Sequence, residues 1–288
     1  MSCANNACVR SSISIVRWLP VGFVLIVICW AYYAYVIELC FYTVECLFER
    51  VIYLIIFHIL LILFLWSYYQ TIFSPVGRPR KEFFLTSEVR RDLESASEEN
   101  LSRMILERYV YQQQIIVENR NFDGSIRYCY KCGCIKPDRC HHCSVCGHCV
   151  LKFDHHCPWV NTCINYYNYK FFVQFLGYGL LLCFWGILTD FQYFIGFWKK
   201  DLRLNNGFGN FQILFLFFVA GMFAISLSCL FCYHLYLTAK NRSTLETFRP
   251  PIFVYGIDKN AYNLGIRKNF LQVFGGITVF WFLPVFSS

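Results

Sequence analysis

The chain has 288 residues, of which 57% are hydrophobic, 20% are aromatic and only 15% are charged, and its net charge is +8. A soluble domain carries about 25% charged residues, so this composition indicates that lipid forms part of the solvent. The modest positive charge fits a membrane surface with anionic lipids, and because no basic helix accompanies it, we expect no nucleic-acid partner.

Four apolar stretches each reach the roughly 20 residues that a transmembrane helix needs. The first two cover residues 18–40 and 51–73, the third begins at Phe171, and the fourth runs from Phe211 to Leu237. Aromatic residues gather at their ends, as they do at membrane interfaces. The sequence therefore predicts a mainly α, polytopic membrane protein, with four transmembrane helices and a cytosolic cysteine-rich module between helices 2 and 3.

The charges that flank these stretches predict an orientation. Two arginines precede the first stretch without a neighbouring acid, and six basic residues follow the fourth. The positive-inside rule then places both termini and residues 74–170 in the cytosol. The basic residues Lys199, Lys200 and Arg203 oppose this orientation, and the other segments outweigh them.

These features divide the chain into six parts. They are a cytosolic N-terminal tail (1–17), transmembrane helices 1 and 2 (18–73), a cytosolic linker with a support helix (74–125), a zinc-binding cysteine-rich domain (126–170), transmembrane helices 3 and 4 (171–237) and a cytosolic C-terminal tail (238–288). Within the linker, leucine and isoleucine residues recur at roughly helical spacing, which predicts one helix over residues 87–119.

Nine cysteines and five histidines lie between Cys129 and Cys163, many of them with two-residue gaps. Such a gap lets a tight turn present two thiolates to one metal ion. Histidines interleaved with cysteines favour zinc over a disulfide scaffold. Two tetrahedral zinc ions use eight ligands, so six of these residues are left over, and their spacing does not show which six.

The run Asp154-His155-His156-Cys157 places an acid, two imidazoles and a thiol within four residues. A nucleophilic thiol needs a base within hydrogen-bond reach, and that base needs a carboxylate to orient it. The run can supply all three groups. The alternative is that Cys157 is one more zinc ligand and Asp154 a surface charge, and the residues alone leave both interpretations open.

The motifs in this region are specific. They are Lys136-Pro137-x-Arg139, His142-Cys143-x2-Cys146-x2-Cys149, Asp154-His155-His156-Cys157-Pro158-Trp159-Val160-Asn161-x-Cys163 and Asn168-Tyr169-Lys170-Phe171-Phe172. With the flanking spans they resemble the DHHC-type protein S-acyltransferases, also called palmitoyltransferases, over nearly the whole chain. Two positions depart from the family pattern: Ser74-Pro75 stands where the family has Asp-Pro-Gly, and Asn165 stands where it usually has Gly.

The resemblance implies roles for individual residues. One structural zinc ion is expected at Cys129, Cys132, His142 and Cys149, and a second at Cys143, Cys146, His156 and Cys163. Cys157 is left as the nucleophile, with His155 as its base and Asp154 as the group that orients the base. Thr244 and Glu246, in a motif similar to Thr-Thr-x-Glu, and Asn269, in a C-terminal motif, are expected to support the active site.

Five residues are candidates for contacts with substrates. Trp159 is expected either to wall the acyl chain or to anchor the chain at the membrane interface. Lys136, Arg139 and Arg249 are candidates for the phosphates of CoA, with solvated charges or lipid headgroup contacts as the alternative. Ala31 either deepens an acyl cavity or packs between helices.

Predictions also concern three polar residues within the spans and two cysteines near the N-terminus. For His58, His234 and Asp190 we expect hydrogen bonds to neighbouring helices. Cys3 and Cys8 are candidates for acylation of the protein itself.

The resemblance implies a protein S-acyltransferase that moves a long-chain acyl group, typically palmitoyl, from acyl-CoA through a Cys157 acyl-enzyme to membrane-proximal cysteines of substrate proteins. Its expected partners are membrane lipid, acyl-CoA and those proteins, and its expected location is an endomembrane or the plasma membrane, with the Golgi first. Two other classes compete. A membrane-tethered zinc-binding interaction module leaves Asp154, His155 and Cys157 without a role, and a transporter needs polar residues within its spans.

Overall fold

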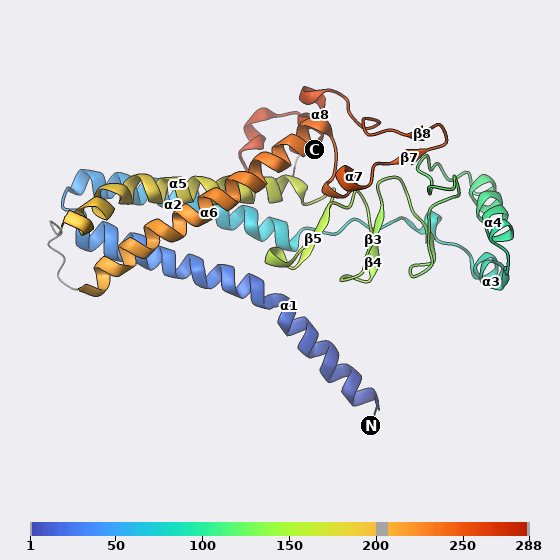
Figure 1. Ribbon diagram of the computed structural model, residues 1–288, viewed down its shortest axis with the longest axis horizontal. Helices are drawn as coiled ribbons and strands as arrows, with labels where there is room; N and C mark the ends of the chain where they lie inside the picture. The colour runs from blue at the N-terminus through green and yellow to red at the C-terminus, as the bar shows by residue number, and fades with distance from the viewer. Residues whose placement is uncertain (1, 200–206, 287–288) are drawn as a thin grey trace.

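The computed structural model describes residues 2–199 and 207–286, with side chains over 14–199 and 209–286. Lys200 and Arg203, and the side chains of Cys3 and Cys8, lie outside this description. The molecule is elongated, with four long helices at one end and a module of short strands and helices at the other (Figure 1). The long helices are α1 (Ser2–Tyr32), which continues as the π-helix η1 (Tyr33–Thr43), α2 (Leu47–Phe73), α5 (Tyr169–Lys199) and α6 (Gly207–Lys240).

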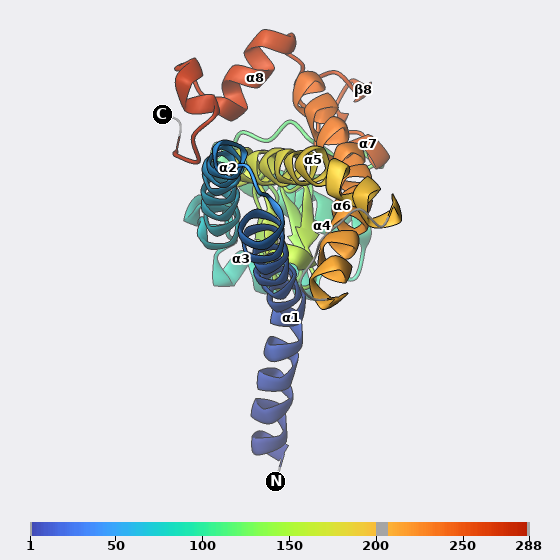
Figure 2. The ribbon, with the colours of Figure 1, turned by 90° about the vertical axis from the view of Figure 1, so that its left-hand side faces the viewer.

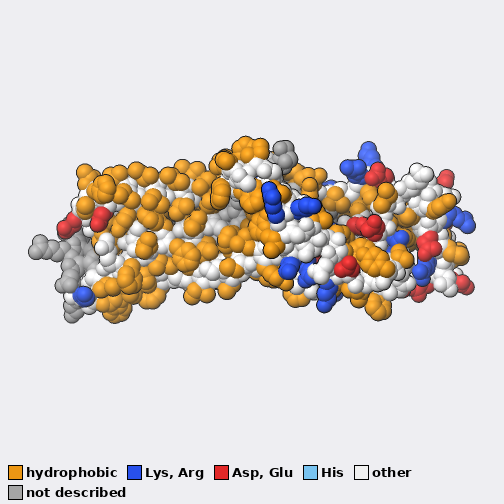
Figure 3. Space-filling model, turned by 90° about the horizontal axis from the view of Figure 1, so that it is seen from above, with side chains coloured by type: hydrophobic (Ala, Val, Ile, Leu, Met, Phe, Trp, Pro, Cys, Tyr) orange, Lys and Arg blue, Asp and Glu red, His pale blue; other side chains and the backbone are white. Residues whose placement is uncertain are grey.

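Each long helix contains a segment that is long and apolar enough to cross a membrane. These segments are Ser14–Thr43, Leu47–Phe73, Tyr169–Lys199 and Gly209–Lys240. Large apolar side chains stay exposed along them, including Ile26, Ile62, Leu188 and Ile225, and the surface of the bundle is mostly hydrophobic (Figure 3). Such a surface fits lipid as its solvent. The prediction of four membrane helices is confirmed.

Helix α5 lies between α2 and α6 and contacts both (Figure 2). Because lipid tails are as apolar as leucine, helices in a membrane associate through close packing. At the module end of the bundle, a Cβ added to Gly179 of α5 would lie 3.1 Å from the ring of Phe64 on α2, so a small residue permits this approach. At the far end, Tyr35, Leu39 and Phe57 build a second buried cluster.

The linker after α2 folds as a short 3-10 turn and two helices. These are η2 (Lys81–Phe83), α3 (Ser87–Ser95) and α4 (Glu99–Gln112). The prediction of one helix over residues 87–119 was wrong, because Ala96 and Glu98 have extended backbone that separates α3 from α4. The apolar residues with helical spacing pack between the two helices, where Leu93 and Leu106 are buried.

Three short antiparallel hairpins form the cysteine-rich module. They are β1 (Tyr128–Cys129) with β2 (Cys134–Ile135), β3 (His141–Cys143) with β4 (His148–Val150), and β5 (His155–Cys157) with β6 (Thr162–Ile164), the last joined through the 3-10 turn η3 (Pro158–Val160). Gly133 and Gly147 close the first two turns at φ of 68° and 74°, which glycine adopts without strain. Strands this short are not stable alone, so the module depends on links between its side chains.

The C-terminal tail folds back against the module end of the bundle (Figure 1). Its elements are α7 (Thr244–Phe248), β7 (Ile252–Phe253), β8 (Gly256–Ile257), α8 (Ile266–Phe274) and the 3-10 turn η4 (Thr278–Trp281). Helix α8 packs against α6 and α5. Two side chains of α5 hold the end of the tail: Lys170 donates to the carbonyl of Val285, and Gln174 donates to the carbonyl of Leu283.

Candidate active site

The first group of predicted metal ligands joins hairpin β1–β2 to hairpin β3–β4. Nδ1 of His142 lies 3.2 Å from Sγ of Cys132 and 3.6 Å from Sγ of Cys129. Cys149 completes the group, in which all ligand atoms lie within 4.8 Å of one another. A tetrahedral zinc ion spaces its sulfur and nitrogen ligands roughly 3.5 Å apart, so these four side chains fit zinc.

The second group joins hairpin β3–β4 to hairpin β5–β6. Nδ1 of His156 lies 3.8, 3.4 and 3.6 Å from the sulfur atoms of Cys143, Cys146 and Cys163. The sulfur atoms of Cys146 and Cys163 are 3.4 Å apart. These distances also match a tetrahedral zinc site. Each group supplies four ligands and leaves no position for water, which is the pattern of a structural zinc site.

Strand alternation decides which side chain enters which group. Successive side chains of a strand point to opposite faces. On β3, His142 belongs to the first metal group and the next residue, Cys143, belongs to the second. On β5, His156 belongs to the second metal group, whereas His155 and Cys157 lie on the opposite face and belong to neither.

Asp154, His155 and Cys157 meet on this free face of β5. Nδ1 of His155 donates to Oδ2 of Asp154 at 2.6 Å, and the imidazole lies close enough to Cys157 for the thiol to raise its pKa. Asp154 and Cys157 are buried, with 3% and 6% of their surfaces exposed. The arrangement is an oriented base beside a thiol, which is what nucleophilic catalysis by cysteine requires.

Thr244, at the start of α7, holds the Asp154 carboxylate in place. Its backbone N–H donates to Oδ1 and its hydroxyl donates to Oδ2, each at 2.8 Å. Burial raises the pKa of Asp154, but the hydrogen bonds from His155 and Thr244 outweigh that effect and keep the pKa below its ordinary value. Asp154 is therefore a carboxylate at neutral pH.

The charge state of His155 follows from the same contacts. Burial lowers the pKa of His155, but its hydrogen bonds to Asp154 and Cys157 outweigh burial and raise the pKa to about 9. At neutral pH these contacts favour an imidazolium beside the Cys157 sulfur.

Cys157 lies where the module meets the membrane helices. Its side chain is part of the buried cluster that includes Phe172 of α5 and Tyr68 of α2. The hydroxyl of Tyr68 donates to the carbonyl of Trp159 at 2.8 Å, which holds η3 on α2. Trp159 is 52% exposed, and its ring lies 6.2 Å from that of Phe23 on α1. The thiol thus has apolar helices on one side and the module on the other.

Asn165, which departs from the family pattern, is buried, and both the oxygen and the nitrogen of its side-chain amide make hydrogen bonds. Its Oδ1 accepts from the backbone N–H groups of Gly77 and Tyr167, and its Nδ2 donates to the carbonyl of Cys163. A Cβ at Gly77 would lie 2.9 Å from the ring of Tyr167, so glycine is required for this approach. The amide therefore ties the segment after α2 to the module.

Arg139 does not have the free guanidinium expected of a contact to CoA phosphates. Its Nε and Nη2 donate to the two carboxylate oxygens of Glu246 at 2.7 Å, and its Nη1 donates to Oδ1 of Asn241 at 3.0 Å. Only 11% of the Arg139 side chain is exposed. The arginine instead joins the module to α7, where Glu246 also completes a capping box with Ser243. The assignment of Arg139 to phosphate is corrected accordingly.

The remaining predicted residues lie apart from one another. Lys136 is half-buried in the loop after β2, and Arg249 is exposed at the end of α7. Ala31 is half-buried and packs against the cluster at the far end of the bundle. Asn269 is buried on α8, where its Nδ2 donates to the carbonyl of Ala239 on α6 at 2.8 Å.

Sequence reasoning missed the place of His234 in this site. The expected hydrogen bond to a neighbouring helix exists, since the hydroxyl of Tyr169 lies 3.1 Å from Nδ1 of His234. His234 also lies beside Asp154 and His155, with polar side-chain atoms of the three within 4.8 Å of one another. In the sequence, the position of His234 in the last turns of the fourth span was the only feature that pointed to a place near the active site. The prediction of a hydrogen bond was wrong for Asp190, because its buried carboxylate has no hydrogen-bond partner in the described structure.

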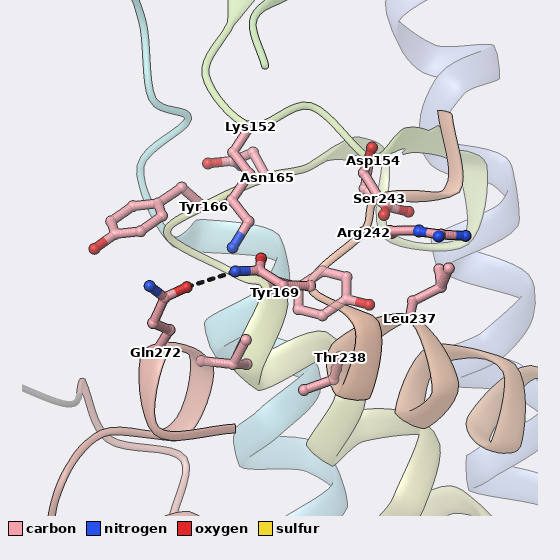
Figure 4. Close-up of a pocket in the computed structure, with 12 residues that line it drawn as sticks. Lys152, Asp154, Asn165, Tyr166, Tyr169, Leu237, Thr238, Arg242, Ser243 and Gln272 are labelled. Atoms are coloured by element: carbon pink, nitrogen blue, oxygen red, sulfur yellow. Dashed lines mark hydrogen bonds between the residues drawn. The ribbon is translucent and has the colours of Figure 1, made fainter. Parts of the chain in front are cut away.

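A small cavity of about 30 Å³ reaches Asp154 from the side of α8 (Figure 4). Lys152, Tyr166 and Gln272 are among the residues that line it, and Nδ2 of Asn241 donates to Oε1 of Gln272 at 2.8 Å. The volume has room for about two water molecules. It is too small for a nucleotide or an acyl chain, so substrates of Cys157 need another approach.

The fold and the site define a class: a multi-pass membrane protein whose Cys/His module presents an Asp–His–Cys group to the end of a four-helix bundle. The family model described as DHHC palmitoyltransferase matches residues 123–250. The chain is 48% identical over 274 residues to Palmitoyltransferase ZDHHC2 of Danio rerio, covering 95% of the chain and 75% of that protein. It is 50% identical over 271 residues to Palmitoyltransferase ZDHHC20-A of Danio rerio (94% and 75%) and 44% identical over 274 residues to Palmitoyltransferase ZDHHC15 of Homo sapiens (95% and 80%). The chain belongs to the DHHC palmitoyltransferase family.

Proposed function

We propose that this protein is a protein S-palmitoyltransferase, which moves a long-chain acyl group from acyl-CoA to membrane-proximal cysteines of substrate proteins. The observation that carries the proposal is the group Asp154–His155–Cys157 at the junction of module and bundle, in which His155 is hydrogen-bonded to Asp154 and lies beside Cys157. Membership of the DHHC palmitoyltransferase family supports the same activity.

In the first step, Cys157 is the nucleophile and His155 is its base. The thiol proton passes to Nε2 of His155, while Nδ1–H of His155 stays on Asp154, which stabilises the imidazolium. The thiolate attacks the carbonyl carbon of the acyl-CoA thioester. A carbon–sulfur bond to Cys157 forms, the bond to the CoA sulfur breaks, and the CoA thiolate leaves and takes the proton from His155.

In the second step, a substrate cysteine takes the place of CoA. His155 accepts its proton, the substrate thiolate attacks the Cys157 thioester, and Cys157 leaves as a thiolate that is protonated again by His155. One thioester is exchanged for another, so the free-energy change is small. The rate then depends on positioning and on thiolate formation.

Two zinc ions have a structural role in this proposal. The ligands are those of the two metal groups: Cys129, Cys132, His142 and Cys149, and Cys143, Cys146, His156 and Cys163. Zinc bound there would cross-link the three hairpins, which are too short to be stable without it. The ion at His156 would hold β5 so that His155 and Cys157 face the bundle.

Thr244, Glu246 and Asn269 support the reacting groups without touching substrate. Thr244 orients Asp154, and Glu246 holds the turn that carries Thr244 through its pairing with Arg139. Asn269 fixes α8 against the end of α6. Thr244 and Glu246 thus join the C-terminal tail to the module, and Asn269 joins α8 to α6.

Substrate contacts are proposed for four residues. Trp159 and Ala31 would contact the acyl chain, since both lie on or against the membrane helices. Lys136 and Arg249 would contact the phosphates of CoA, because neither side chain has an ion-pair partner in the described structure. Cations without an ion-pair partner favour an anionic ligand.

The proposed orientation places both termini and residues 126–170 in the cytosol, on an endomembrane with the Golgi first. The positive-inside rule supports it, because basic residues concentrate after the fourth span. Cys157 would then lie at the depth where a membrane-buried acyl chain meets cytosolic CoA.

The function is tested by incubating the purified protein in detergent with radiolabelled palmitoyl-CoA. Hydroxylamine-labile label is expected on the wild-type chain and on the control Cys229→Ser, which changes an exposed span cysteine, and not on Cys157→Ser. Equal label on Cys157→Ser contradicts the assignment. Two bound zinc ions with no label on any variant would instead favour the membrane-tethered zinc-binding interaction module.

A further inference from the structure

We propose that His234 is a positioning residue for the active site: it holds the ring of His155 in the orientation in which Nδ1 meets Asp154 and the other ring nitrogen faces Cys157. The inference deepens the proposed function and rests on it for the acylation measurement. It is carried by the geometry of α5 and α6 around β5.

His234 lies directly beside the catalytic pair although it belongs to a membrane helix. Its ring centroid is 5.9 Å from that of His155, with 38° between the ring planes. Polar side-chain atoms of Asp154, His155 and His234 lie within 4.8 Å of one another. Only 3% of His234 is exposed, so this contact is part of the buried interface between bundle and module.

Two residues of α5 hold His234 in place. The hydroxyl of Tyr169 lies 3.1 Å from its Nδ1, and the ring of Phe172 packs against it edge-on at 5.0 Å. The Phe172 ring also packs against His155 at 5.4 Å. His155 is therefore bounded by Phe172 and His234, and the position of His234 is fixed in turn by α5.

This boundary matters because the ring of a histidine turns easily. Rotation about χ2 is broad and nearly two-fold, so an unrestrained imidazole samples both orientations. A half-turn of His155 would replace nitrogen by carbon towards both Asp154 and Cys157, and the hydrogen bond to Asp154 would be lost. Packing on two sides of the ring opposes this turn.

The polar character of His234 needs an explanation beyond packing. An imidazole in a membrane helix costs desolvation that leucine or phenylalanine avoids. Tyr169 accounts for one ring nitrogen. A ring nitrogen of His234 also lies within 4.8 Å of polar side-chain atoms of Asp154 and His155, so the polar edge of this ring is at the active site. The titratable groups near His155 are Asp154, Cys157 and His234, and Tyr169 contacts His234.

The test compares His234→Leu, which fills the space without ring nitrogens, with His234→Gln, which keeps a polar group. Single-turnover acylation of Cys157 by palmitoyl-CoA is expected to slow about tenfold in His234→Leu, with KM changed less than about twofold, and to stay within about threefold of wild type in His234→Gln. The matched control is His58→Leu, because His58 is also a span histidine that contacts a tyrosine hydroxyl, that of Tyr32 at 3.2 Å. The control is expected to keep the wild-type rate.

Two results overturn the proposal. One is a wild-type acylation rate in His234→Leu. The other is an equal loss in His234→Leu and His234→Gln, which indicates a packing role alone. If His234→Leu does not retain two zinc ions, His234→Phe, which keeps the ring volume without nitrogens, replaces it with the same expected and contradicting results.

A second measurement separates this proposal from the proposed function. Alkylation of Cys157 by iodoacetamide at neutral pH, followed by peptide mass spectrometry, reports on the His155–Cys157 pair without acyl-CoA. It is expected to slow about fivefold in His234→Leu and not in His58→Leu. If the wild-type chain takes up no acyl group but this difference persists, the function fails and the positioning role stands. If acylation is normal in every variant, the positioning role fails and the function stands.

Discussion

Thr244 donates two hydrogen bonds of 2.8 Å to the carboxylate of Asp154, although 90 residues separate the two in the chain. The first comes from a backbone N–H at the start of α7, and the second from the threonine hydroxyl. Because the carboxylate in turn orients His155, the C-terminal tail takes part in setting the base for Cys157.

Replacing Thr244 by Ala removes the hydroxyl and keeps the backbone bond. A hydrogen bond to a charged group is worth roughly 1.5–3 kcal/mol, so acylation of Cys157 should slow about tenfold or more, whereas Thr244→Ser should stay within about threefold of wild type. Thr247→Ala is the control, because that hydroxyl bonds only the carbonyl of Ser243 within α7. Single-turnover labelling measures the rates, and equal rates for the Ala and Ser variants would contradict the role of the hydroxyl.

Replacing Arg139 by Ala should affect stability more than the affinity for acyl-CoA. It leaves the carboxylate of Glu246 buried without its partner, which costs roughly 3–5 kcal/mol and lowers the thermal unfolding midpoint. Arg249→Ala is the contrasting variant, since that exposed residue should change KM and not the midpoint. A large rise in KM for Arg139→Ala with an unchanged midpoint would restore the phosphate assignment.

The adjacent residues His155 and His156 should differ in their effect on zinc. They point to opposite faces of β5: His156 belongs to one of the two four-ligand Cys/His groups, whereas His155 lies with Asp154 and His234. His155→Ala should retain two zinc ions and lose acylation, whereas His156→Ala should lose zinc and then the fold of the module, because binding and folding of such sites are coupled. Elemental analysis of the purified variants measures the zinc content. Loss of zinc in His155→Ala would be inconsistent with this arrangement.

The pH dependence of Cys157 should depend on Asp154. The hydrogen bond to Asp154 raises the pKa of His155, whereas burial lowers it, so Asp154→Asn should lower that pKa from about 9. The imidazolium beside Cys157 is then lost at a lower pH, so the step in the pH profile of Cys157 alkylation that reports on His155 should move to lower pH than in wild type. Iodoacetamide rates between about pH 5 and about pH 10 measure this shift. Asp123→Asn, which alters an exposed loop carboxylate, is the control, and matching profiles for wild type and Asp154→Asn would refute the coupling.

Parts of the fold that depend on local pattern could be predicted from the sequence. Length and hydropathy determine a membrane span within one segment, so all four spans were found. The break between α3 and α4 could not be predicted in the same way, because Leu93 and Leu106 keep helical spacing across it. The spacing of these two leucines predicts that both face a core. It does not predict whether they lie on one helix or on two.

The candidate site also has features that the sequence predicts and features that it does not. The sequence by itself determined a zinc-type module, a run of four residues with nucleophile, base and acid, and the family, because ligand spacing and motif identity are local properties. Only the tertiary structure decided the rest: that the alternation of β5 separates His155 from His156, that Arg139 pairs with Glu246, and that His234 lies beside the base. Those contacts join segments far apart in the chain, and they depend on how α6 and α7 dock on the module, for which no single segment carries a signal.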